Sequence, residues 1–166
     1  MDFTEIDGGL LFGILHLTDG VVLKGEYLDG LEDDIEEEDL EGIQRFIFPN
    51  VLDTKRIGVG TFQFSEEHVA ISAYLALRKG LLSENKIVKI GVCWITSNVV
   101  HPLKLQFYLF MVLNDLKNLE KINDREFINK KLQDYVLSLK AGETEIPEIV
   151  PATLEDFLRF FSFDDI

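Results

Sequence analysis

The densest group of chemically active side chains in this 166-residue chain is a run of carboxylates. Residues 26–41 hold ten acids and no base, so this segment contributes −10 of the net charge of −14 and leaves −4 on the rest. The acids could form a short helix with Leu31, Ile35 and Leu40 along one edge, or an acidic loop. In either form the run could be a solvated surface, a partner-binding surface or a metal site.

Two properties of the carboxylate run bear on its chemistry. Ca²⁺ and Mg²⁺ prefer oxygen ligands, but the spacing does not match an EF-hand loop, which alternates its ligands and places a glycine at the sixth position. A focused negative potential, in contrast, speeds the encounter with a positive patch and rejects acidic competitors. We therefore assign partner binding to the acids at the centre of the run, which are Glu32, Asp33, Asp34, Glu36, Glu37, Glu38 and Asp39.

The histidines and the single cysteine form no recognisable catalytic or metal-binding pattern. His16, His68 and His101 are far apart and do not share the i,i+4 spacing of helical metal ligands. We expect His68 at the surface near a helix start, His16 exposed or half-buried on a strand, and His101 at a turn. Cys93 lies in an apolar run that favours a buried core residue over a catalytic thiolate. We predict no metal and no cofactor.

Neither nucleotide-binding nor hydrolase motifs occur. Gly58 and Gly60 form an isolated G-x-G that runs into a strand-like segment, so close backbone packing or a bulge is the better interpretation. No G-x-S-x-G nucleophile elbow accompanies the histidines.

Phenylalanines gather near the C-terminus and allow two interpretations. Phe157, Phe160, Phe161 and Phe163 could dock the last helix on the sheet, or they could supply aromatic anchors to a partner. For the second interpretation, Phe160 and Phe163 are the candidate partner-binding residues.

The sequence pattern of the N-terminal third predicts β-strands. Two apolar runs, 10–17 and 21–28, flank Asp19-Gly20, which predicts a hairpin with a type I′ turn in which both residues have positive φ. Asp29-Gly30 closes the second strand. The alternating segment 56–64 predicts a further strand, and the β-branched segment 86–96 predicts a central one.

Four helices are predicted in the rest of the chain. Ser65 would cap the first, with Glu66 and Glu67 in its first turn, an apolar face at helical spacing and an end at Gly80. Its face would comprise Ala70, Ala73, Tyr74 and Leu77.

The other three helices lie in the C-terminal half. Pro102 suits the first helical position before 103–119, where a helix is favoured over a strand paired with 86–96. A further helix begins at Asp124, has Lys140 in its last turn, where a cation complements the helix dipole, and ends at Gly142. Thr153 caps the last helix.

Composition limits the fold and the compartment. Hydrophobic residues make up 46% and charged residues 28%, as is common in globular proteins. We predict a single globular α+β domain over 1–166, with a mainly antiparallel sheet, an N-terminal hairpin and three to four helices, the last ones C-terminal. The lone cysteine, the absence of a positive n-region and the short longest apolar stretch (107–113) predict a cytoplasmic protein.

These observations lead to one functional hypothesis and two alternatives. The negative charge disfavours nucleic acid and anionic membranes as direct partners. It favours a non-enzymatic binding or inhibitor module for a basic protein, which is similar to toxin-immunity proteins in composition alone. The alternatives are a carboxylate- or metal-dependent enzyme and a structural subunit that self-associates through the aromatic C-terminal helix.

Overall fold

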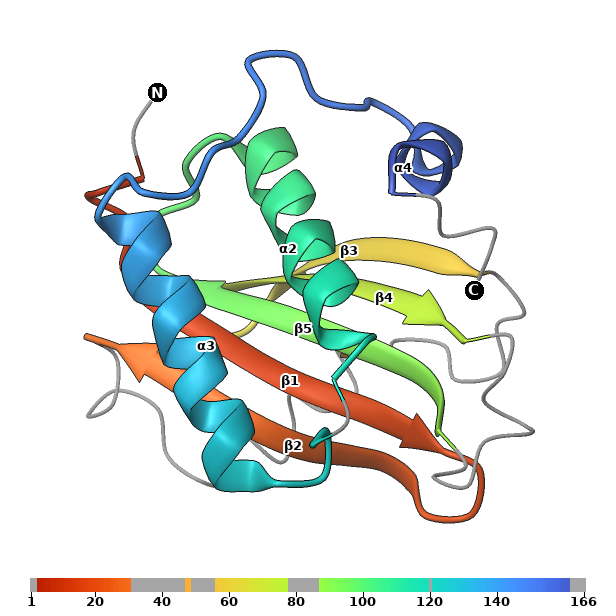
Figure 1. The fold of residues 1–166 in the computed structure, drawn as a ribbon. Coiled ribbons are helices and arrows are strands. Elements are labelled where there is room, and N and C mark those ends of the chain that lie inside the picture. The colour runs from red at the N-terminus through yellow and green to blue at the C-terminus, as the bar shows by residue number, and fades with distance from the viewer. Residues whose placement is uncertain (1–2, 31–46, 49–55, 78–86, 120, 162–166) are drawn as a thin grey trace.

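The computed structural model describes residues 3–30, 47–48, 56–77, 87–119 and 121–161. Within them, five antiparallel strands form one sheet in the order β2-β1-β5-β4-β3, and helices α2, α3 and α4 cover one of its faces (Figure 1). This arrangement confirms the predicted α+β class, with its N-terminal hairpin and C-terminal helices. The elements are β1 (Gly8–His16), β2 (Gly20–Asp29), β3 (Ile57–Gln63), β4 (Val69–Ala76), β5 (Ile87–Thr96), α2 (Pro102–Leu116), α3 (Arg125–Lys140) and α4 (Leu154–Phe160).

The N-terminal hairpin forms as predicted, but its turn is of a different type. Residues 17–19 connect β1 to β2, so the loop has three residues, and only Gly20 adopts a positive φ, of 75°. The His16 ring explains the longer loop, because its Nδ1 accepts hydrogen bonds from the backbone N–H groups of Thr18 (3.2 Å) and Asp19 (3.1 Å). The predicted type I′ turn is therefore wrong, whereas the half-buried position of His16 is confirmed.

Strand β5 is the centre of the sheet, as the β-branched segment 86–96 predicted. It pairs with β1 on one side and β4 on the other, and nearly all of its side chains are buried. Cys93 is fully buried on this strand, and burial raises the pKa of its thiol to about 12. The thiol therefore stays protonated at neutral pH and acts as a core residue, as expected.

The predicted helix after Ser65 is wrong, because residues 69–76 form strand β4. The strand turns Ile71, Ala73 and Leu75 toward the helices and Ala70 and Tyr74 toward the opposite face. Since both faces are buried, apolar residues occur at both parities, and the alternation that identifies a half-buried strand is hidden. The expected end at Gly80 lies outside the described residues.

Ser65 caps a tight turn instead of a helix. Its Oγ accepts a hydrogen bond from the backbone N–H of His68 (3.1 Å) and lies 2.8 Å from His68 Nδ1. The His68 side chain is only 6% exposed and its ring meets Phe64 edge-on, so its expected surface position is also wrong.

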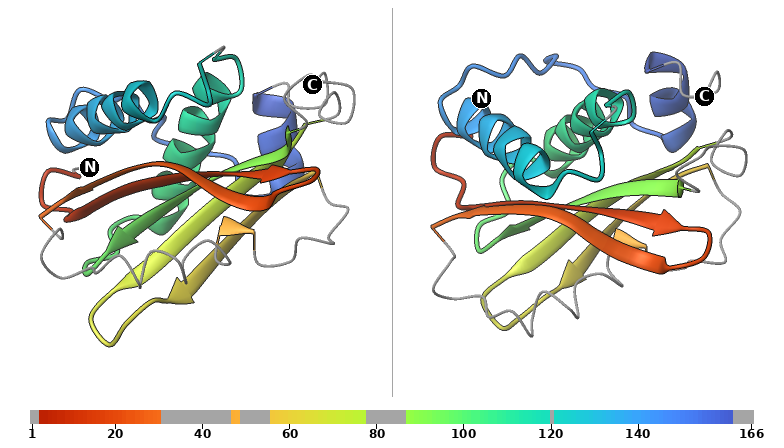
Figure 2. Two further views of the ribbon diagram at one scale, coloured as in Figure 1. Left: turned by 90° about the horizontal axis from the view of Figure 1, so that it is seen from below. Right: turned by 60° about the horizontal axis from the view of Figure 1, so that its bottom comes forward.

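The three C-terminal helices confirm their predictions, and each begins at a residue that local sequence marks. His101 adopts a left-handed conformation (φ 47°) before Pro102 opens α2. The Asp124 side chain accepts from the N–H of Phe127 at the start of α3, and Thr153 accepts from Asp156 at the start of α4. All three lie on the same side of the sheet (Figure 2). Within the described part of the chain, no helix has the length and apolarity needed to cross a bilayer.

Candidate functional site

The predicted partner-binding acids fall mostly outside the described part of the chain. This holds for all seven central acids of the run and for Phe163. The structure does describe Glu26 and Asp29, which precede them on β2, and Ile47 and Phe48, which follow them. The site can therefore be built from the two ends of the segment 31–46.

On the N-terminal side of the segment, helix α3 contacts β2 at Glu26. The Glu26 carboxylate lies 3.4 Å from the Arg125 guanidinium, and its backbone N–H donates to Asn129 Oδ1 at 2.7 Å. Gly25 allows this close approach, because a Cβ there would lie 2.5 Å from the Ile128 side chain. The edge strand β2 is thus fixed against α3 along its last residues.

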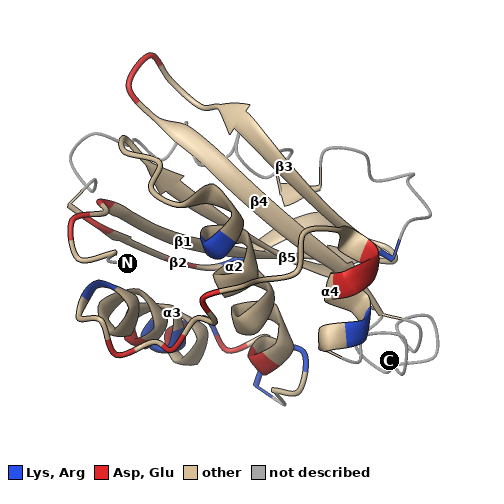
Figure 3. Cartoon of the chain, turned by 90° about the horizontal axis from the view of Figure 1, so that it is seen from above, with Lys and Arg blue, Asp and Glu red and all other residues tan. Residues whose placement is uncertain are grey.

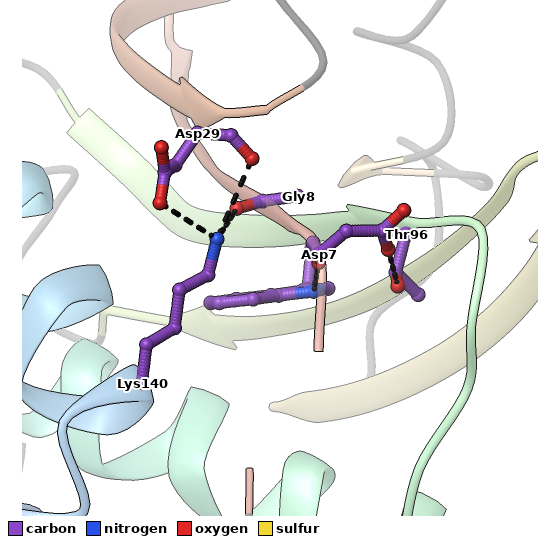
Figure 4. Close-up of polar contacts among 6 residues, drawn as sticks. Asp7, Gly8, Asp29, Thr96 and Lys140 are labelled. Atoms are coloured by element: carbon purple, nitrogen blue, oxygen red, sulfur yellow. Dashed lines mark hydrogen bonds and ion pairs between the residues drawn. The ribbon is translucent and has the colours of Figure 1, made fainter. Parts of the chain in front are cut away.

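The side chain of Lys140 fixes the end of β2 itself (Figure 4). Its Nζ donates to the Gly8 carbonyl at 2.8 Å and to the Asp29 carbonyl at 3.4 Å, and lies 3.1 Å from the Asp29 carboxylate. The Lys140 side chain is only 14% exposed. Asp29, the last described acid before the segment, is therefore neutralised within the protein.

A neighbouring polar cluster joins the start of β1 to the end of β5. The Asp7 carboxylate accepts from the Thr96 hydroxyl and from the backbone N–H (2.9 Å) and hydroxyl of Ser97. The Trp94 indole donates to the Asp7 carbonyl at 3.2 Å (Figure 4). Burial acts to raise the pKa of Asp7, but the hydrogen bonds from Ser97 and Thr96 outweigh it and leave that pKa lowered. This cluster positions Gly8, whose carbonyl binds Lys140.

The second end of the segment is anchored on the opposite face of the sheet. Gly13 and Gly91 face each other across β1 and β5 and leave a depression there. Ile47 and Phe48 fill it: a Cβ on Gly91 would lie 2.4 Å from Ile47 and 3.1 Å from the Phe48 ring. Both side chains are at least 97% buried, with exposures of 0% and 3%. The described residues that flank 31–46 are therefore fixed, Asp29 at the end of β2 and Ile47 and Phe48 on the β1–β5 pair.

Charge is distributed differently in this segment and in the described residues. The segment has eight acids and one base, Arg45, which gives −7, half of the total of −14. The described residues have sixteen acids and eleven bases, a net −5, and both signs alternate along α3 (Figure 3). Negative charge is thus concentrated in the segment and mixed with positive charge elsewhere.

The aromatic cluster of α4 separates the two interpretations of the C-terminal phenylalanines. Phe157 is 2% exposed and packs on Phe107 and Phe110, with ring centroids 6.2 and 4.7 Å away, so it is a core residue that docks α4 on helix α2. Phe160 touches Phe107 at 5.2 Å but remains 55% exposed. Phe160 is therefore the described member of the cluster that is accessible to another molecule.

The remaining candidate chemical groups are dispersed. His101 is exposed and meets the Phe3 ring edge-on at 5.9 Å, while His16 and His68 have the turn roles described above. In the ranges that the structure describes, no three His, Cys, Asp or Glu side chains lie close enough together to hold a metal ion.

One polar group that the sequence analysis did not single out lies between α2 and α3. The Tyr135 hydroxyl donates to the Asp115 carboxylate beside a cavity that Tyr108 also lines. The only sequence signal is a tyrosine on the apolar face of each helix, and such tyrosines are common in cores. Their meeting depends on how the two helices pack.

Comparison with known proteins does not assign a family. No protein-family model matches this chain, and a search of curated proteins finds no significant match.

Proposed function

We propose that this protein is a non-enzymatic binding module that engages a basic protein through the acids of residues 32–39. The observation that carries the proposal is that residues 31–46 hold half of the net negative charge, while described contacts hold the residues on either side of this segment. Exposed like charges that are close together add their potentials, and this raises the rate at which an oppositely charged patch is encountered.

The structure narrows which acids can serve this function. Glu26 and Asp29 belong to the same run, but Arg125 and Lys140 already pair with them. A partner would have to break those pairs to use these two carboxylates. The proposal therefore excludes them and rests on Glu32, Asp33, Asp34, Glu36, Glu37, Glu38 and Asp39.

The anchors of the segment support the same function. Lys140 fixes Asp29 before the segment, and the buried side chains of Ile47 and Phe48 fix the chain after it. Fixing both flanks of a chain segment lowers the conformational entropy that the segment can lose on binding. A basic protein whose own ligand is a polyanion, such as a nuclease, is the partner class that fits best, because dense carboxylates then compete with phosphates for the same cationic surface.

Matched charge variants test the proposal. In the segment variant the seven central acids become the corresponding amides. In the control variant seven exposed glutamates elsewhere become glutamine: Glu66, Glu67, Glu126, Glu143, Glu145, Glu148 and Glu155. Both variants change the net charge equally, so a difference between them reports the position of the charge.

Affinity capture from the native host, followed by titration of the isolated partner, supplies the measurement. We expect wild type and control to bind one basic protein at about 50 mM salt and to lose it at about 300 mM, because screening shortens the Debye length. The segment variant should bind at least roughly tenfold more weakly at low salt. Equal loss in both variants, or a captured partner without excess basic charge, would refute the proposal.

Phe160 supports a second candidate, self-association through α4. Its exposed ring extends an aromatic cluster that already includes Phe107 and Phe161. If α4 mediates assembly, light scattering should show an oligomer for wild type and a monomer for Phe160→Ser. A monomeric wild type ends this candidate.

A further inference from the structure

A cavity of about 420 Å³ opens between helices α2 and α3, on the helical side of the sheet. This volume lies within the range of small-molecule sites, roughly 300–1,000 Å³. Side chains from both helices and one residue after α3 line it: Tyr108, Met111, Val112, Asp115, Asp134, Tyr135, Ser138 and Thr144. It shares no residue with the acidic run, so a role for this cavity is independent of the proposed function.

Tyr108 gives this cavity a buried polar group without a partner. The residue is 2% exposed and its ring packs edge-on against Trp94, with centroids 5.9 Å apart. Its hydroxyl makes no hydrogen bond to any described residue. A buried hydroxyl in this state is unfavourable unless a water or a ligand satisfies it, and Tyr108 is one of the residues that line the cavity.

The polar rim of the cavity is negative. Asp115 and Asp134 supply two carboxylates, and no Lys, Arg or His is among the lining residues. Burial, the hydrogen bond to Asp115 and the charges of Asp115 and Asp134 all raise the pKa of Tyr135. The two carboxylates in the lining disfavour additional negative charge in the cavity and favour a cation.

We propose that this cavity binds a small organic cation, a primary ammonium carried on a short apolar chain. The ammonium would donate to the Asp115 and Asp134 carboxylates and to the Tyr108 hydroxyl oxygen. The apolar chain would pack on Met111 and Val112. An ammonium has three donors and no acceptor, so it complements carboxylates and a phenolic oxygen.

The composition of the lining favours an organic cation over a metal ion. Ca²⁺ binds six to eight oxygen ligands and Mg²⁺ demands near-octahedral oxygen geometry. The cavity offers two carboxylates beside an apolar wall formed by Met111 and Val112. That mixture of apolar and acidic groups matches an alkylammonium ion.

The test uses the full-length chain and four probes at equal ionic strength: n-butylammonium chloride, 1-butanol, sodium butyrate and magnesium chloride. We expect butylammonium alone to shift the amide NMR signals of α2 and α3 and to raise the melting temperature, with a dissociation constant on the order of 1 mM for so small a ligand. Equal shifts with 1-butanol would reduce the site to an apolar cavity and overturn the proposal. Equal shifts with magnesium would make it a metal site, with the same consequence.

Variants locate the binding. Asp115→Asn should weaken butylammonium binding about tenfold, because a charge-assisted contact is lost. Tyr108→Phe should weaken it severalfold while melting no lower than wild type, because that change removes an unpartnered hydroxyl. Glu126→Gln, on α3 outside the cavity lining, is the matched control and should bind as wild type. Unchanged affinity in both cavity variants would place the ligand elsewhere and refute the proposal.

Discussion

Helices α3 and α4 cover the same face of the sheet and both bury apolar side chains, and α3 adds polar contacts to the strands. Helix α3 meets β1 and β2 through placed polar contacts, in which Lys140 donates to Gly8 and Asp29, and Glu26 contacts both Arg125 and Asn129. Helix α4 meets Phe107 and Phe110 of α2 through tilted and edge-on contacts of its phenylalanine rings. Apolar burial therefore supplies most of the stabilisation in both helices, whereas directional polar contacts fix the register of an edge strand under a helix.

The aromatic side of this comparison carries the largest expected effect. Phe157→Ala should lower the free energy of unfolding by about 3–5 kcal/mol, because it empties a buried site between Phe107 and Phe110. Phe160→Ala should cost about 1 kcal/mol or less, because the Phe160 ring is 55% exposed. Urea denaturation followed by Trp94 fluorescence measures both. Similar losses in the two variants would contradict the distinction between core and surface within α4.

The polar side should show a smaller effect that depends on burial. Lys140→Met removes contacts to two carbonyls and one carboxylate and should cost about 1–3 kcal/mol. Arg125→Met breaks a pair whose guanidinium side is 55% exposed, so its cost should stay below about 1 kcal/mol. The same denaturation experiment, with amide exchange on β2, compares them. If Arg125→Met proves as costly as Lys140→Met, burial does not decide the value of these contacts.

Local signals explain which parts of the fold could be predicted. Asp124, Gly142 and Thr153 lie at helix ends whose backbone groups need a cap or a positive φ, so sequence marks those ends directly. The hairpin followed from Asp19-Gly20, but the loop length did not, because the His16 ring accepts two turn N–H groups. A side chain that replaces a backbone acceptor leaves no periodic sequence pattern, so the loop length could not be predicted.

The failures share a tertiary cause. The segment 69–76 is a strand because β3 and β5 pair with it on both sides and both of its faces are buried. From the sequence, Lys140 is a cation that complements a helix C-terminus, yet its ammonium donates to the carbonyl of Gly8, 132 residues away. The Tyr108 cavity exists only because α2 and α3 meet over the sheet. Partners so distant in sequence are selected by packing, which no local window contains.

The N-terminal cap of α4 offers a finer test of how that helix is held. Thr153→Ala removes the hydroxyl that accepts from the Asp156 N–H and should cost about 1 kcal/mol. Because α4 has only seven residues, we expect faster amide exchange confined to 154–160 rather than throughout the protein. Asp124→Ala, the equivalent change in α3, serves as the comparison, since buried apolar side chains and polar contacts hold that helix along its length. Faster exchange across the sheet in Thr153→Ala would show that α4 is not an independent unit.

Acid should weaken the polar contacts of the Asp7 carboxylate and leave the aromatic cluster around Phe157 unaffected. Asp7 has a pKa below its ordinary value of 3.8, so its carboxylate binds protons less readily when the protein is folded than when it is unfolded. The resulting stabilisation is complete above the unfolded pKa and is lost as pH falls through the lower folded one. Urea midpoints measured from about pH 6 to about pH 2 should therefore fall at the acid end in wild type and fall less in Asp7→Asn. In Phe157→Ala the urea midpoint should be lower at every pH but should fall with pH as steeply as in wild type, because no titrating group is removed. A pH dependence that changes with Phe157→Ala would mean that the aromatic cluster and the polar contacts are coupled and do not act independently.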